Sequence, residues 1–158
     1  MNTIYKNLVI NETNGRKKAL LKKLEEREKQ IIQAETDLVA FGNKEALLIF
    51  QLMKETGIRL ADIVDLKSGN LCGRELSVVE RKYSSTKLYR YADGSKPIIS
   101  EETAVRLSVR EDGRFFTYNK NYYIAIFKKA FTDTTFHYYQ IRRYALDKRS
   151  LLPEIAVK

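Results

Sequence analysis

Apolar residues recur at helical spacing in several segments that are separated by clear breaks. The spacing predicts a charged helix over 16–37, a second helix over 44–55 and a third over 59–66, each with one apolar face. After residue 70 the pattern becomes extended and predicts strands over 76–83 and 88–91, with short extended pieces near Leu71 and over 97–99. Helical spacing returns over 103–109, 121–131 and 136–148. The pattern therefore predicts an α+β fold, mainly α, with a small antiparallel sheet.

Local signals mark several of these boundaries. Asn43, Ser100 and Asn119 each precede a helical segment, where a short polar side chain can accept a hydrogen bond from a free backbone N–H. Pro153 interrupts helical structure near the end of the chain, because it lacks the N–H that a helix interior requires. The predicted helices therefore have defined starts.

Composition narrows the class of protein. The 158 residues are enough for one core, and 44% hydrophobic with 31% charged residues is typical of a globular protein. Cys72 is the one cysteine and His137 the one histidine, which argues against a disulfide framework and a cysteine- or histidine-based metal site. Apolar runs are too short to span a membrane, and residues 1–10 lack the pattern of a signal peptide. We expect a cytoplasmic protein with no cofactor, no metal and no membrane partner.

The net charge of +9 is concentrated in the second half of the chain. Residues 1–72 contribute only +2 of it, and nine of the ten tyrosines also lie beyond residue 72. Cations displace counterions from a phosphate backbone and phenols hydrogen-bond phosphate, so this mixture favours a partner with a phosphate backbone, of which double-stranded DNA is one. The alternative is that the excess lysine and arginine only keep the protein soluble.

One segment gives this charge a specific place. Arg59 follows a Thr-Gly break directly and stands at the head of the helix predicted over 59–66. An arginine at a helix start lies next to free backbone N–H groups, which together can hold a phosphate. The alternative is a solvated arginine at an ordinary helix start.

Five segments, in order, resemble the catalytic domain of the tyrosine recombinases, or phage integrases. Residues 56–63 (TGIRLADI) resemble the family's first arginine box, and 81–87 (RKYSSTK) fall at the hairpin that carries its lysine. Residues 97–102 (PIISEE) resemble the segment after that hairpin, and 115–130 the run into the second arginine box. Residues 139–146 (YQIRRYAL) resemble that second box. The resemblance covers roughly 40–148, and implies a charged helix or arm over 1–39 before an integrase-catalytic-like domain over 40–158.

The resemblance implies a role for each matched residue. In this family a tyrosine attacks a DNA phosphodiester, while two arginines clamp the non-bridging oxygens and a lysine protonates the leaving oxygen. Arg59 and Arg142 match the clamp, and Lys82 matches the general acid, with Lys87 as its alternative. We expect further DNA contacts from basic residues near these boxes: Arg81, Lys87, Arg90, Lys120 and Arg143.

Two departures from the family bear on catalysis. Tyr139 stands where the family has a histidine, and His137 lies two residues earlier, about 200° around a helix. The nucleophilic tyrosine is not found, because only 16 residues follow Arg142 and no tyrosine follows Tyr144. Tyr144 should point away from the clamp. We therefore expect a chain that ends before the nucleophile, lacks the family's N-terminal DNA-clamping domain and does not cleave DNA in cis.

Three interpretations remain open at this point. The first is a DNA-binding protein of the recombinase fold, acting as a regulator or accessory factor of a mobile element near the nucleoid. The second is a fragment of an active integrase, with the tyrosine in an absent segment or supplied by a full-length recombinase or another protomer. The third is a helical protein-interaction module whose arginine boxes are coincidental. The separation of Arg59 and Arg142 in space distinguishes the first two interpretations from the third.

Overall fold

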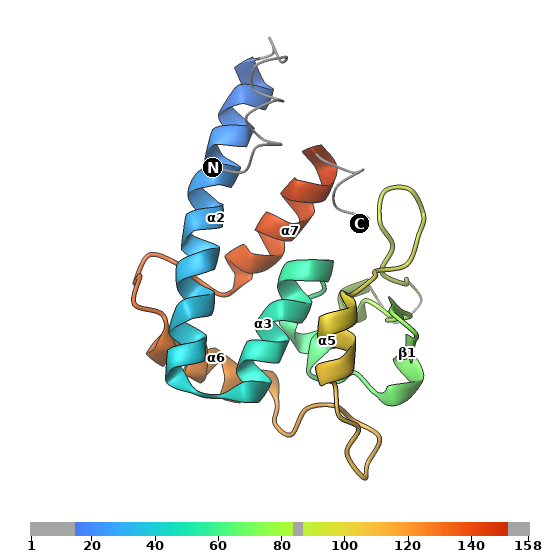
Figure 1. Ribbon diagram of the computed structural model, residues 1–158. Coiled ribbons are helices and arrows are strands. Elements are labelled where there is room, and N and C mark those ends of the chain that lie inside the picture. Colours follow the sequence, from blue (N-terminus) through green and yellow to red (C-terminus); the bar gives the residue numbers. More distant parts are fainter. Residues whose placement is uncertain (1–14, 84–86, 152–158) are drawn as a thin grey trace.

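The structure is a computed structural model that describes residues 15–83 and 87–151. Four helices of more than ten residues make up most of its helical part. They are α2 (Gly15–Phe41), α3 (Lys44–Thr56), α6 (Lys120–Ala130) and α7 (Tyr139–Leu151). As Figure 1 shows, α3 lies between α2 and the short helix α5 (Glu101–Arg106), while α6 crosses the lower end of α2. The fold is therefore mainly α with a small β part, as the hydrophobic pattern predicts.

The core is centred on α3. Five apolar side chains of this helix are almost completely buried, and they pack among α2, α6 and α7: Ala46, Ile49, Phe50, Leu52 and Met53. Helix α2 joins the same core through one apolar face, which consists of Leu24, Ile31, Ala34 and Leu38. The boundary expected between residues 39 and 40 therefore falls inside a continuous helix.

The predicted helix starts are confirmed. The side chains of Asn43, Ser100 and Asn119 accept hydrogen bonds from the first backbone N–H groups of α3, α5 and α6. The predicted ranges of two of the later helices are wrong. Helix α5 ends at Arg106 and not at 109, because the chain turns extended at Leu107. Helix α7 begins at Tyr139 and not at 136.

The segment after α3 is less helical than its apolar pattern suggests. Helix α4 (Leu60–Ile63) is a single turn, although the sequence predicts a helix over 59–66. A second short helical turn, η1 (Ser68–Asn70), follows it and leads into the sheet. Apolar residues on both sides of the turn are buried, so burial and not helical repetition accounts for the pattern here.

The β region is smaller than predicted. Strands β1 (Leu71–Cys72) and β2 (Glu75–Leu76) form an antiparallel pair, and Glu75 makes a single bridge to Ile98. The strands expected over 76–83 and 88–91 are reduced to one antiparallel bridge, between Val79 and Leu88. The first of them gives way to a 3-10 turn, η2 (Arg81–Tyr83), so the ladder cannot continue. The extended piece over 97–99 is confirmed by its bridge and by the hydrogen bond from Ile99 N–H to Arg74.

Candidate nucleic-acid interface

Arg59 is fixed at the junction between α3 and α4. Gly57 ends α3 in the left-handed conformation, with φ of 73°, and Arg59 then caps α4 with extended backbone. The carbonyl of Arg59 accepts hydrogen bonds from Asp62 and Ile63, and its own N–H donates to the Tyr89 hydroxyl at 3.3 Å. The backbone N–H of Arg59 itself therefore has a partner within the fold. Because α4 has only one turn, any anion binding here depends on the arginine side chain.

Arg142 approaches the same junction from α7. This helix packs along α3 and buries Ile141 and Tyr144 against it. The approach is close, since a Cβ added at Gly57 would lie 3.0 Å from Cδ2 of Leu146. A glycine at position 57 therefore serves both the left-handed turn and the contact with α7, and that contact sets the position of Arg142.

The charge of Arg59 acts on Arg142. Burial lowers the pKa of the Arg142 guanidinium, and the positive charge of Arg59 lowers it further, while Tyr89 and Glu80 act in the opposite direction. Among the described residues, the Nε atoms of Arg59 and Arg142 are the two buried side-chain polar atoms without a hydrogen-bond partner. A buried donor without a partner costs free energy, and two like charges side by side add to that cost. An anion bound between them would relieve both.

A buried carboxylate, Asp62, and a buried phenol, Tyr89, hold the backbone at Arg59 in place. The Tyr89 hydroxyl donates to Oδ2 of Asp62 at 2.5 Å and accepts from the Arg59 N–H. Burial and the hydrogen bond with Asp62 raise the pKa of Tyr89 well above its ordinary value. Tyr89 therefore stays protonated and joins the hairpin to the start of α4, which holds Arg59 in place.

The hairpin around the Val79–Leu88 bridge has a distinct inner face. Glu80 N–H donates to Lys87 and Tyr89 N–H donates to Val78, which fixes the register of the two segments. Side chains alternate across a strand, and opposed residues share a face. Val78, Glu80 and Tyr89 are accordingly buried, whereas the bridge residues themselves are partly exposed. The inner face therefore brings Glu80 to the side of the arginine pair, where its charge acts on Arg142.

This register separates the two candidate lysines. Lys87 lies opposite Glu80 in the hairpin register, although its own residue is exposed. Lys82 lies in the 3-10 turn η2 and is exposed as well. Lys87, the alternative general acid, is thus held in the paired part of the hairpin, while Lys82 follows the point where the alternation ends.

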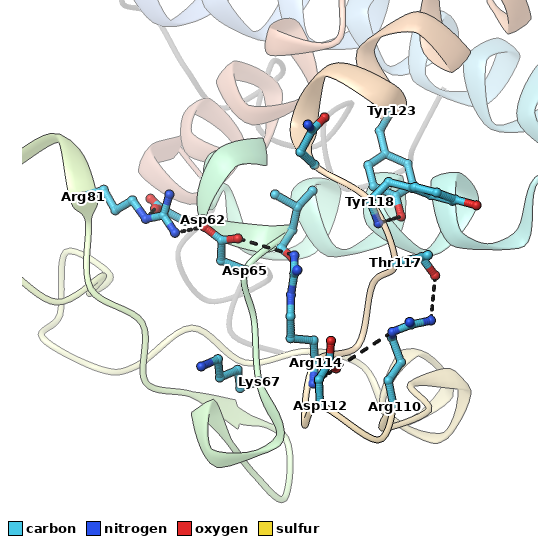
Figure 2. Close-up of polar contacts among 12 residues, drawn as sticks. Asp62, Asp65, Lys67, Arg81, Arg110, Asp112, Arg114, Thr117, Tyr118 and Tyr123 are labelled. Carbon is cyan, nitrogen blue, oxygen red and sulfur yellow. Dashed lines mark hydrogen bonds and ion pairs between the residues drawn. The ribbon is translucent and has the colours of Figure 1, made fainter.

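Arg81 is engaged by carboxylates of the neighbouring helical turn. Its guanidinium pairs with Asp65 and lies 3.9 Å from Oδ1 of Asp62. Arg114 reaches Asp65 from the other side and donates to the Val64 carbonyl at 2.9 Å. Figure 2 shows the two arginines flanking Asp65. Arg81 is therefore part of an ion-pair network next to α4, and 63% of its side chain is still exposed.

The other expected DNA contacts are distributed over the surface. Arg143 is exposed and near enough to lower the pKa of Arg142, as a weaker influence than burial and Arg59. Arg90 is exposed on the chain segment after Tyr89. Lys120 is exposed at the first position of α6, a helix that contacts α2 and α3 and lies apart from the arginine pair. The structure therefore groups Arg81 and Arg143 with the pair, but not Lys120.

Tyr139 and His137 form a second feature near Arg142. The expected helical offset of about 200° between them does not apply, because His137 precedes α7. The backbone N–H of His137 donates to Oε1 of Gln140. The His137 ring is nearly parallel to that of Tyr139, with centroids 5.4 Å apart. Tyr139 is 59% exposed and lies three residues before Arg142 on α7. The imidazole of His137 is thus stacked beside the phenol of Tyr139 at the start of α7.

Three residues of the site did not emerge as candidates from the sequence. Asp62 lies within the first arginine box, and in the structure it anchors Tyr89 and Arg81. Glu80 and Tyr89 carry a detectable signal, since they alternate with Val79 and Leu88 on the two sides of a hairpin. A charged residue at an inward position of a strand is the unusual feature that could have identified Glu80.

A concave surface lies elsewhere on the molecule. A groove of about 670 Å³ runs between α2, α3, α5 and α7, and neither Arg59 nor Arg142 lines it. Its walls mix both signs of charge, including Glu35, Glu55, Lys54 and Arg149. The groove is therefore not an extension of the arginine pair.

Comparisons with known proteins give no family for this chain. No family model matches it, and no curated protein or solved structure matches it. Across residues 15–83 and 87–151, no helix has the length and apolar character needed to cross a membrane. Within the same residues, no cluster of three or more His, Cys, Asp or Glu side chains could hold a metal ion.

Proposed function

We propose that this chain is a DNA-binding protein with the tyrosine recombinase fold, in which Arg59 and Arg142 clamp a phosphate of the DNA backbone. The observation that carries the proposal is the pair of buried, unpartnered Nε atoms on two guanidiniums, of which the charge of Arg59 acts on Arg142. Planar guanidiniums bind phosphate oxygens through paired hydrogen bonds, and a phosphate would supply the missing acceptors. We expect the protein to act as a regulator or accessory factor of a mobile element.

The arrangement of elements supports the fold part of this proposal. The two arginines come from segments 83 residues apart in sequence, and the hairpin that carries Lys87 lies between them in the chain. This is the order that the resemblance implies. A chance pair of arginine boxes has no reason to converge on one point.

The competing interpretation as a helical interaction module depends on a free apolar face on α2. In the structure that face is largely used, because Leu24, Ile31 and Leu38 are buried in the common core. The same helix also exposes Ile32, Val39 and Phe41, so part of its apolar surface is not used by the core. The face that joins the core is thus unavailable to a partner helix, whereas this second, smaller set of apolar side chains is accessible.

Duplex DNA binding is expected to weaken steeply with salt, because the clamp and its exposed neighbours displace counterions. Arg143→Gln should lower the slope of log affinity against log salt by roughly 0.9, the value for one phosphate contact. Fluorescence anisotropy of a labelled duplex at several salt concentrations measures the slope. Lys29→Gln, an exposed change of the same charge on α2, should leave it unaltered. Equal slopes for wild type and Arg143→Gln would exclude Arg143 from the interface.

We expect binding without a covalent protein–DNA adduct. Tyr144 is 4% exposed and cannot reach a phosphate, and Tyr139 lies one turn from Arg142 on the same helix, too close to the clamp for in-line attack. Charge neutralisation by arginine does not replace a nucleophile. The measurement is incubation with a nicked suicide duplex followed by denaturing electrophoresis. A denaturant-resistant band that Tyr139→Phe abolishes would contradict this expectation.

A further inference from the structure

Glu80 is a buried carboxylate for which phosphate clamping alone gives no reason. It is 8% exposed and lies on the inner face of the hairpin with Val78 and Tyr89. A carboxylate beside a phosphate site repels the ligand and loses hydration when buried, so it weakens binding unless it serves another purpose. Its place beside the arginine pair therefore needs an explanation.

Charges of both signs gather around the clamp. The carboxylates there are Asp62, Asp65 and Glu80, and the guanidiniums are Arg59, Arg81, Arg114, Arg142 and Arg143. Asp62 and Asp65 are committed to Tyr89, Arg81 and Arg114 through hydrogen bonds and ion pairs. Glu80 is the buried carboxylate on the hairpin side, and its charge acts on Arg142. Glu80 therefore offsets part of the positive charge at the clamp itself.

We infer that Glu80 is a specificity-determining residue that restricts the Arg59–Arg142 clamp to phosphodiesters and disfavours terminal phosphates. This inference rests on the proposed function of the clamp. A phosphodiester carries one negative charge, whereas a phosphomonoester carries nearly two at neutral pH. Two uncompensated guanidiniums would favour the dianion. With the Glu80 carboxylate beside them, the second charge of a monoester meets repulsion, and the clamp selects phosphates inside a continuous strand over strand ends.

The test compares two small probes of the clamp. Dimethyl phosphate has the charge of a phosphodiester, and methyl phosphate at pH about 8 has the charge of a strand end. Each is titrated at constant ionic strength, and the dissociation constants are taken from shifts of the Arg59 and Tyr89 backbone amides in NMR spectra. These amides report on the clamp because the Arg59 N–H binds the Tyr89 hydroxyl.

Wild type is expected to bind dimethyl phosphate at least as tightly as methyl phosphate. Glu80→Gln should shift the ratio about tenfold toward methyl phosphate, the size expected for one nearby charge in a half-buried site. Glu80→Asp retains the charge and should keep the wild-type ratio. Glu26→Gln, an exposed change of the same chemistry on α2, should also keep it.

The outcomes separate the two claims. A wild-type preference for methyl phosphate overturns the role of Glu80, whether or not Glu80→Gln folds. An unchanged ratio in a folded Glu80→Gln protein overturns it as well. If neither probe shifts the two amides in wild type or in Glu80→Gln, the clamp itself is wrong and the proposed function fails.

Discussion

Replacing Arg142 with methionine is expected to raise the free energy of unfolding by about 1 kcal/mol while weakening duplex DNA binding by about 100-fold. The lowered pKa of Arg142 means that the fold disfavours its charged form, first through burial and then through Arg59. Methionine fills similar volume and removes a donor that has no partner. Binding is lost because one half of the phosphate clamp is gone. Urea denaturation and fluorescence anisotropy measure the two effects.

Arg143→Met is the matched control, since Arg143 is the exposed neighbour on the same helix. It should leave stability nearly unchanged and should reduce affinity far less than Arg142→Met does. A purely structural Arg142 would behave in the opposite way, with lower stability and unaltered DNA binding. That result would remove the main support for a phosphate site.

Gly57→Ala is expected to destabilise the fold by about 2 kcal/mol, whereas Gly42→Ala should cost about 1 kcal/mol. Both glycines follow a long helix in the left-handed conformation, with φ of 73° and 87°, so the backbone strain is similar. Only at Gly57 does an added Cβ meet another side chain, Leu146 of α7 at 3.0 Å. The difference between the two variants therefore measures the close approach of α3 and α7.

A double-mutant comparison isolates this contact. In a Leu146→Ala background the excess cost of Gly57→Ala over Gly42→Ala should largely disappear, because the crowded methyl group is absent. DNA affinity should fall for Gly57→Ala and stay constant for Gly42→Ala, since only the former displaces the helix that carries Arg142. Equal behaviour of the two glycine variants in both assays would show that the approach of α7 does not position the clamp.

The helices and their starts were predictable because the signals are local. Asn43, Ser100 and Asn119 cap helices through their own side chains, which requires no knowledge of the rest of the fold. The short elements were not predictable in the same way. Residues 60–66 have apolar residues at helical spacing, yet the chain makes one turn and then follows the contour of the core.

The residues of the candidate site also differ in how far they could be predicted from the sequence. Arg59 and Arg142 could be named from their boxes, but their convergence depends on how α7 packs against α3, which no local pattern encodes. The roles of Asp62 and Tyr89 arise from a hydrogen bond between residues 27 positions apart. The sequence offers the chemistry of such residues, while their partners become apparent only in three dimensions.

The central claim is that Arg59 and Arg142 hold a DNA phosphate through their buried Nε–H groups. The most direct measurement is a nitrogen–proton NMR spectrum of the arginine Nε–H groups, assigned with Arg59→Lys and Arg142→Lys, before and after addition of a short duplex. The account predicts that both signals move together and exchange more slowly with solvent once DNA is bound, because each donor gains an acceptor. Unchanged signals from both groups, with shifts confined to exposed arginines such as Arg143, would contradict it.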